Sequence, residues 1–167
     1  MNMTDLPEYV LDRTFDAPRD MVWRAWTDPT LLHRWYGPNI ETVIHKYDLK
    51  PGGVWLNEMK MKAGSGYSRM DFEEVTPPEK LVWRHASTDA DWNVAANPMM
   101  PDWPRILLTT VTFEEEGEKT KVRLSQVPVD ATEAEVTCFA NMMANMDGGW
   151  GQGYAILDEM LVELQAK

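Results

Sequence analysis

The sequence predicts an α+β fold in which a curved antiparallel sheet of about six to seven strands wraps around a long C-terminal helix. One strand-like segment is followed by two short helical segments. About six further strand-like segments then succeed one another through short turns, which favours antiparallel pairing. The end of the chain carries an apolar stripe with helical spacing. This order of elements indicates a sheet whose concave face is covered by one helix.

The N-terminal part is expected to contain one strand and two helices. The strand is predicted over 9–16, where the apolar residues alternate. Pro18 can open a helix over 18–26, because the missing N–H of proline costs nothing in the first turn. Asp28 is a plausible cap for the second short helix, and Pro29 suits its first position.

The middle of the chain is expected to form most of the sheet. Glycine and proline mark the turns, at Pro51-Gly52-Gly53, Gly64-Ser65-Gly66 and Pro77-Pro78. The predicted strands lie over 42–49, 54–62, a segment containing Met70 and Phe72, 81–86, 106–115 and 120–127. In the second of these strands, alternation places four side chains on one face: Trp55, Asn57, Met59 and Met61.

The remainder of the chain, from about residue 131, is expected to be helical. Apolar side chains recur at helical spacing in its second half: Trp150, Tyr154, Leu157, Leu161 and Leu164. Four glycines between 148 and 153 interrupt this region, and each costs about 1 kcal/mol relative to alanine in a helix interior. The helical stretch is therefore predicted to break near Asp147, giving a shorter helix from about Thr132 and a long final one.

Length and charge limit the class of protein. A chain of 167 residues, 44% hydrophobic and 26% charged, is typical of one globular domain, here 1–167. The formal net charge of −11 repels phosphate groups, so neither nucleic acid nor a membrane is expected as a partner. No stretch approaches the roughly 20 apolar residues of a membrane-spanning helix, and 1–8 shows no signal peptide. The expected location is cytoplasmic.

The sequence offers no coherent set of catalytic or metal-binding residues. His33, His45 and His85 lie in different predicted elements, without the spacing that metal ligands require. Cys138 is the only cysteine, and its apolar neighbours favour a buried thiol. No G-x-S-x-G motif is present. The sequence therefore predicts no catalytic residue, no metal and no cofactor.

Eight tryptophans and twelve methionines are many for this length, and they suit either a ligand cavity or a bulky core. If the strands alternate as predicted, apolar side chains and a few polar ones converge between sheet and helix, as in a small-molecule pocket. The candidate ligand-binding residues are Trp55, Asn57, Met59, Met61, Met70, Phe72, Trp83, His85, Gln126, Trp150, Tyr154 and Leu157. The alternative is a filled core in which the same side chains pack against one another.

Several motifs lie at turns and packing positions: Ala17-Pro18, Trp26-Thr27-Asp28-Pro29, Trp35 with Gly37-Pro38, Pro51-Gly52-Gly53, Pro77-Pro78 and Trp150. With them, nearly the whole chain resembles the activator-of-heat-shock-chaperone-ATPase-like family. That family belongs to the START/SRPBCC superfamily, which shares the helix-grip fold of the birch-pollen-allergen type. The resemblance implies a deep cavity between the sheet and the long helix, commonly for a hydrophobic small molecule.

Three functions follow as expectations from the residues and from this resemblance. The first is the binding of a hydrophobic or aromatic small molecule in the cavity. The second is a cyclase- or hydrolase-like reaction in the same cavity, with His85 or a pocket carboxylate such as Glu58 or Glu74 as acid–base. The third is a stress-related role as a co-chaperone of a heat-shock chaperone ATPase.

Residues 87–104 form a longer insert than the family pattern implies. Its three prolines, at 98, 101 and 104, oppose regular strand pairing. It also contains large apolar side chains, which usually mark a contact when they are exposed: Trp92, Met99, Met100 and Trp103. The insert is therefore predicted to be a lid or an oligomer contact, such as that of a homodimer; the alternative is that it folds back on the domain.

Overall fold

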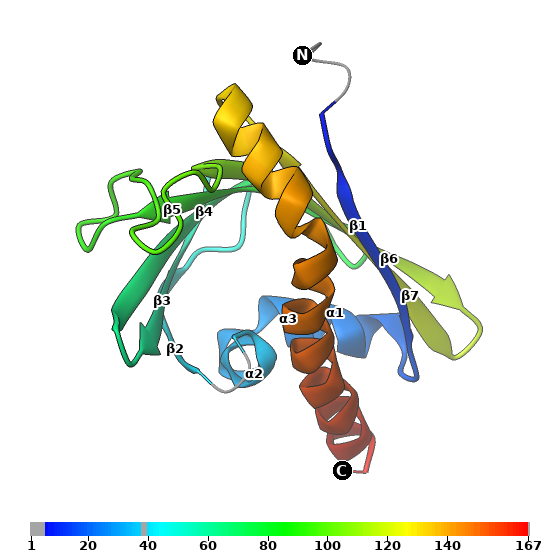
Figure 1. The fold of residues 1–167 in the computed structure, drawn as a ribbon. Coiled ribbons are helices and arrows are strands. Elements are labelled where there is room, and N and C mark those ends of the chain that lie inside the picture. Colours follow the sequence, from blue (N-terminus) through cyan, green and yellow to red (C-terminus); the bar gives the residue numbers. More distant parts are fainter. Residues whose placement is uncertain (1–5, 38–39, 167) are drawn as a thin grey trace.

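A computed structural model describes residues 6–37 and 40–166 of the chain (Figure 1). Pro38 of the resemblance motifs and residues 1–5 of the segment searched for a signal peptide lie outside these ranges. The elements, in chain order, are β1 (Tyr9–Phe15), α1 (Arg19–Thr27), α2 (Pro29–Trp35), β2 (Glu41–Tyr47), β3 (Val54–Met61), β4 (Gly64–Thr76), β5 (Lys80–Thr88), β6 (Ile106–Glu116), β7 (Lys119–Pro128) and α3 (Glu133–Gln165).

Within the described residues, seven strands form one antiparallel sheet in the order β1-β7-β6-β5-β4-β3-β2. From β2 to β7 each strand pairs with its neighbour in sequence, and β1 closes the order against β7. Figure 1 shows the sheet curving around α3, with α1 and α2 at one end of its concave side. The predicted helix-grip architecture is therefore confirmed, including the two short helices after the first strand.

Local signals start the helices where the sequence places them. The Asp28 side chain accepts a hydrogen bond from the backbone N–H of Thr30 at 3.0 Å, and Pro29 occupies the first turn of α2, as predicted. At the start of α3, the Thr132 hydroxyl accepts from the Glu135 N–H while the Glu135 carboxylate accepts from the Thr132 N–H. This reciprocal capping box satisfies two donors that the first turn would otherwise leave unpaired.

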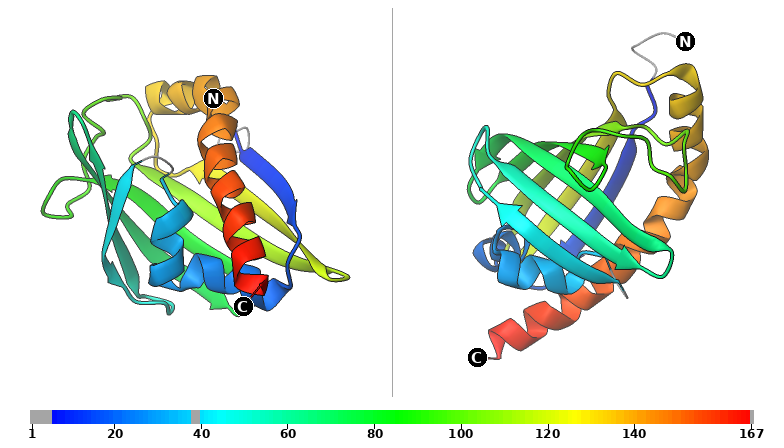
Figure 2. Two further views of the ribbon diagram at one scale, coloured as in Figure 1. Left: turned by 90° about the horizontal axis from the view of Figure 1, so that it is seen from below. Right: turned by 90° about the vertical axis from the view of Figure 1, so that its left-hand side faces the viewer.

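The predicted break near Asp147 is wrong, because α3 runs without interruption from Glu133 to Gln165. Beyond the glycines, α3 buries Tyr154, Leu157 and Met160 against the sheet. Each such side chain contributes about 1.5–3 kcal/mol, which outweighs about 1 kcal/mol for each helical glycine. The helix is nevertheless not straight, since Figure 2 shows its axis changing direction along its length. Among the described helices, α3 included, none is both long and apolar enough to cross a membrane.

Replacing Gly148 with alanine should raise the free energy of unfolding by about 1 kcal/mol, because alanine is the better helix former. Gly148 is exposed on α3, and an added Cβ would meet no atom within 4 Å. Urea denaturation followed by circular dichroism measures the change. Gly53→Ala is the contrasting case and should destabilise, since its Cβ would lie 2.1 Å from the Asp48 carbonyl oxygen. Equal effects at the two positions would contradict this account.

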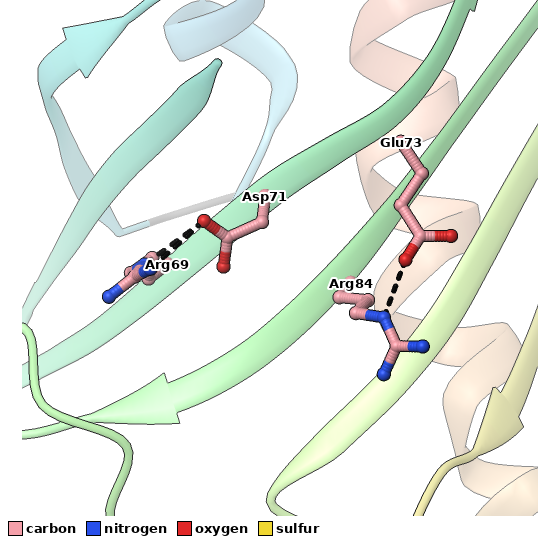
Figure 3. A network of polar contacts seen from close by, with 4 residues as sticks. All are labelled: Arg69, Asp71, Glu73 and Arg84. Carbon is pink, nitrogen blue, oxygen red and sulfur yellow. Dashed lines mark hydrogen bonds and ion pairs between the residues drawn. The ribbon is translucent and has the colours of Figure 1, made fainter. Parts of the chain in front are cut away.

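The two faces of the sheet differ in character. The inner face carries the large buried side chains of the core, such as Trp83 on β5 and Phe72 on β4. On the outer face, Arg69 pairs with Asp71 and Arg84 pairs with Glu73 (Figure 3). Exposed ion pairs of this kind contribute little to stability. These charged side chains make the outer face of the sheet polar. We therefore expect a site for an apolar ligand on the inner face.

Candidate ligand-binding site

A cavity of about 330 Å³ lies between the inner face of the sheet, the end of α2 and the middle of α3. The connection between β5 and β6, which corresponds to most of the predicted insert, contributes one side chain to its wall. The lining residues are Trp35, Tyr36, Gly37, Met59, His85, Trp103, Leu107, Gln126, Met146, Gly149, Trp150 and Gly153. Aromatic and apolar groups therefore form most of the wall.

The helix wall consists of Met146, Gly149, Trp150 and Gly153. Steps of three and four residues place these positions on one face of α3. Gly149 is exposed where α3 borders the cavity, and a Cβ added there would meet no atom within 4 Å. The Trp150 ring stacks on Trp26 behind it, with centroids 6.2 Å apart and an interplanar angle of 21°.

The sheet wall supplies two polar side chains, His85 from β5 and Gln126 from β7. Gln126 is 4% exposed, and its Nε2 donates to the Thr109 hydroxyl at 3.3 Å. One amide atom of Gln126 is used in this way, which leaves the other available to a ligand. The lining residues in the described ranges include no aspartate, glutamate, lysine or arginine. A charged ligand would therefore lose hydration without gaining an ionic partner.

Burial lowers the pKa of the His85 imidazole to about 4, because desolvation disfavours its charged form. At neutral pH the ring is therefore uncharged, with one N–H donor and one acceptor nitrogen. Burial also raises the pKa of the Tyr36 hydroxyl, which remains protonated. The cavity wall is thus electrically neutral around pH 7.

This shift predicts a pH dependence of stability. The unfolded chain has a histidine pKa of about 6.5, so between about pH 6.5 and pH 4 it binds more protons at His85 than the folded protein does. The free energy of unfolding should therefore fall as pH is lowered through this window. His85→Phe should remove this component, whereas substitution of the exposed His33 by phenylalanine should leave it in place. Urea denaturation of the three proteins across the window measures it, and equal pH slopes would contradict it.

The structure distributes the twelve predicted site residues over three environments. Met59, His85, Gln126 and Trp150 line the cavity. Met61 is 37% exposed and lies beside a second hollow, next to Met99 of the insert. The others are buried in the core around the cavity without lining it: Trp55, Asn57, Met70, Phe72, Trp83, Tyr154 and Leu157.

Eight lining residues are absent from the predicted set, and the helical period of the sequence could have indicated three of them. Met146, Gly149 and Gly153 share a helix face with Trp150, so the helical period points to them. The other five come from the end of α2, the insert and β6, and their place depends on tertiary packing: Trp35, Tyr36, Gly37, Trp103 and Leu107.

The two carboxylates considered for acid–base chemistry lie away from the cavity, which corrects that expectation. Glu58 accepts a hydrogen bond from the Ser65 hydroxyl and bonds to the His45 ring at 2.8 Å. It lies on the opposite face of β3 from Met59, as alternation requires. Glu74 pairs with Lys80 at 3.5 Å. Within residues 6–37 and 40–166, no three His, Cys, Asp or Glu side chains gather where they could hold a metal ion.

Solved structures of three bacterial proteins share the fold. A protein from Nitrosomonas europaea is 23% identical, with both chains covered completely (100%) and a TM-score of 0.74. A protein from Mycobacterium smegmatis is 21% identical, covering 94% of this chain and 91% of its own, with a TM-score of 0.78. A protein from Arthrobacter aurescens is 20% identical, covering 98% and 90%, with a TM-score of 0.79. Identities this low show the fold alone.

Among curated proteins, none matches the sequence. The family model for the activator of Hsp90 ATPase homolog 1-like protein matches residues 16–162. This match extends from the end of β1 to the last turns of α3 and includes the lining residues on every wall of the cavity. The chain therefore belongs to the activator of Hsp90 ATPase homolog 1-like protein family.

Proposed function

We propose that the protein binds an uncharged, mainly apolar or aromatic small molecule in the cavity between the sheet and α3. One observation carries the proposal: a hollow of about 330 Å³ is walled by aromatic and aliphatic side chains, with Gln126 and His85 as polar groups on the sheet side. Small-molecule sites usually measure about 300–1,000 Å³ and combine apolar walls with a few convergent polar groups. The family fold supports the same reading, since START-like domains commonly hold hydrophobic ligands in this place.

The walls suit a flat ligand. Tryptophan and tyrosine rings bind an aromatic or conjugated skeleton through offset or edge contacts. Such rings come from three directions in the cavity, namely Trp35 and Tyr36 at the end of α2, Trp103 in the insert and Trp150 on α3. Removing apolar surface from water contributes about 25 cal/mol for each Å². The ligand's affinity should therefore increase with the area of its apolar skeleton, until the cavity is full.

The insert takes part in this proposal through Trp103. Its ring packs against Phe139 near the start of α3, with centroids 5.4 Å apart, and it also lines the cavity. We propose that this segment covers the bound ligand. Deleting 91–102 removes the Met100 carbonyl that accepts from the Trp103 N–H, so it should displace Trp103 and weaken ligand binding. An oligomer contact would instead show as a change in sedimentation coefficient.

Titration with N-phenyl-naphthylamine tests the function directly. This uncharged dye becomes strongly fluorescent in apolar surroundings, so binding should raise and blue-shift its emission. Bound dye should also raise the unfolding midpoint, because it stabilises the native state alone. Anilinonaphthalene sulfonate, which adds a negative charge to a similar skeleton, should bind more weakly. A midpoint that the uncharged dye never shifts, with no emission increase, would reject the proposal. Native mass spectrometry of protein from its own host would then identify the natural ligand.

A further inference from the structure

Three buried side chains behind the cavity carry hydrogen-bond donors that no described residue accepts. The atoms are Trp26 Nε1, Trp83 Nε1 and Tyr154 Oη. Arg19 Nε and Asn57 Nδ2 are also buried without an acceptor among the described residues, but they do not belong to this aromatic group. Trp26 and Trp83 are 1% exposed and Tyr154 is 0% exposed. Buried polar groups in folded proteins are almost always paired, because an unpaired one forfeits its hydration. We call these three side chains the donor cluster.

The donor cluster is compact and adjoins the cavity. The Trp26 ring centroid lies 6.4 Å from that of Trp83 and 6.3 Å from that of Tyr154. On its other side, Trp26 stacks on Trp150, which lines the cavity. Trp83 also shares the inner face of β5 with the cavity residue His85. The Trp150 indole therefore stands between the cavity and the rings of Trp26 and Tyr154.

The Trp150 side chain packs against the rings of Trp26, Tyr36 and Tyr154 and also lines the cavity. Gly149 and Gly151 flank it, and a Cβ at either position would meet no atom within 4 Å. Trp150 itself is half-buried, in contrast to the rings of the donor cluster. A shift of this one indole would open the cavity toward Trp26 and Tyr154, with α3 remaining in place.

The chemistry of the donor cluster selects among polar groups. Each of its three atoms has a hydrogen to donate, so an acceptor oxygen satisfies it and a protonated amine does not. The Arg13 guanidinium lies 6.0 Å from the Tyr154 ring centroid and is paired with Asp158. A carboxylate would therefore have to give up its hydration without an unpaired cation in return. An uncharged carbonyl oxygen accepts hydrogen bonds and carries no net charge, so it satisfies the donors without the loss of ionic hydration.

Building on the proposed function, we propose that the cavity selects aromatic ligands bearing a carbonyl group, whose oxygen accepts hydrogen bonds from the donor cluster once the Trp150 indole moves aside. The apolar skeleton occupies the cavity, and the carbonyl specifies the orientation. Binding then pairs donors that the free protein leaves unpaired, so the preference for a carbonyl arises from the protein's own unpaired groups.

Fluorenone and fluorene provide the test, because they share one tricyclic skeleton and differ in the carbonyl oxygen. Each is titrated against the protein holding N-phenyl-naphthylamine, and the loss of dye emission gives its affinity. Fluorenone should bind roughly three- to tenfold more tightly than fluorene, the ratio expected for one net hydrogen bond. Equal affinities would overturn the inference and leave the proposed function standing. If neither compound nor the dye binds, the proposed function itself fails.

Tyr154→Phe then tests whether the donor cluster is responsible. This variant should reduce the preference for fluorenone, while its affinity for fluorene stays unchanged. Its unfolding midpoint should not fall, because the hydroxyl that it removes has no partner among the described residues. Tyr67→Phe is the matched control, since Tyr67 packs against Trp92 on the outer face of the sheet, and it should keep the preference. A full preference in Tyr154→Phe would overturn the assignment. Trp83→Phe gives a second, independent removal of a donor.

Discussion

Replacing Trp26 with alanine should lower the free energy of unfolding by about 3–5 kcal/mol, the usual cost of truncating a buried tryptophan. Trp26 is 1% exposed, and its ring packs edge-on against Trp35 and Phe113. These neighbours belong to α2 and β6, so the vacated volume is bounded by separate elements that cannot all collapse into it. Urea denaturation followed by circular dichroism, with an unchanged slope, measures the loss.

Trp92→Ala is the matched control for this prediction. Trp92 is half-buried, and it contacts His45 and Tyr67 on the outer side of the sheet. Because its ring is only half-buried, truncation removes less buried apolar surface than at Trp26. The loss should be much smaller than at Trp26. Equal losses in the free energy of unfolding would mean that the buried Trp26 ring contributes no more to stability than the half-buried Trp92 ring does, and would contradict the prediction.

Gly149→Leu should weaken the binding of N-phenyl-naphthylamine on the order of tenfold or more, or about 1.4 kcal/mol. Gly149 is exposed where α3 borders the cavity, and nothing lies within 4 Å of its missing Cβ, so a leucine side chain should extend over the cavity and obstruct the dye. Stability should not decrease, because leucine is the better helix former by several tenths of a kcal/mol. Dye titration and urea denaturation of the same preparation measure the two effects separately.

Gly148→Leu controls for the change of residue type. Gly148 precedes Gly149 on the same helix and is exposed as Gly149 is, but it does not line the cavity. This variant should bind the dye like the wild type and should share the gain in stability. If Gly148→Leu and Gly149→Leu weaken the dye equally, binding occurs outside the cavity and the proposed function loses its site.

The fold could be predicted because its signals are local. Asp28 with Pro29 starts a helix, and the Glu116–Lys119 turn joins two alternating strands, whatever the rest of the chain does. The continuity of α3 could not be predicted in this way. There, tertiary packing of side chains such as Leu157 overrides the local preference of the glycines.

The cavity lining depends on which inner-face residues other elements cover. Trp55 and Met59 share one face of β3, so alternation cannot distinguish them. In the fold, Tyr36 packs against Trp55 with centroids 5.0 Å apart and buries it, while Met59 remains at the cavity. Trp103 lines the cavity from an irregular segment, and such a segment has no periodic sequence pattern from which the position of its side chains could be predicted. Periodicity therefore identifies the inner face, and packing decides which part of it stays open.

The stacking of Trp150 on Trp26 also has an optical consequence. Trp26 lies 4.6 Å from Trp35 and 6.4 Å from Trp83, and Trp83 lies 6.0 Å from Trp55, measured between ring centroids. Over such separations the excited states of indoles are coupled, so absorbed light migrates among the rings and near-ultraviolet circular dichroism gains exciton bands. A molecule that quenches Trp150 therefore also lowers the emission of Trp55, although these two rings do not contact each other directly and are both packed against Tyr36. The intrinsic fluorescence of the protein should thus report occupancy of the cavity with a larger signal than one tryptophan would give.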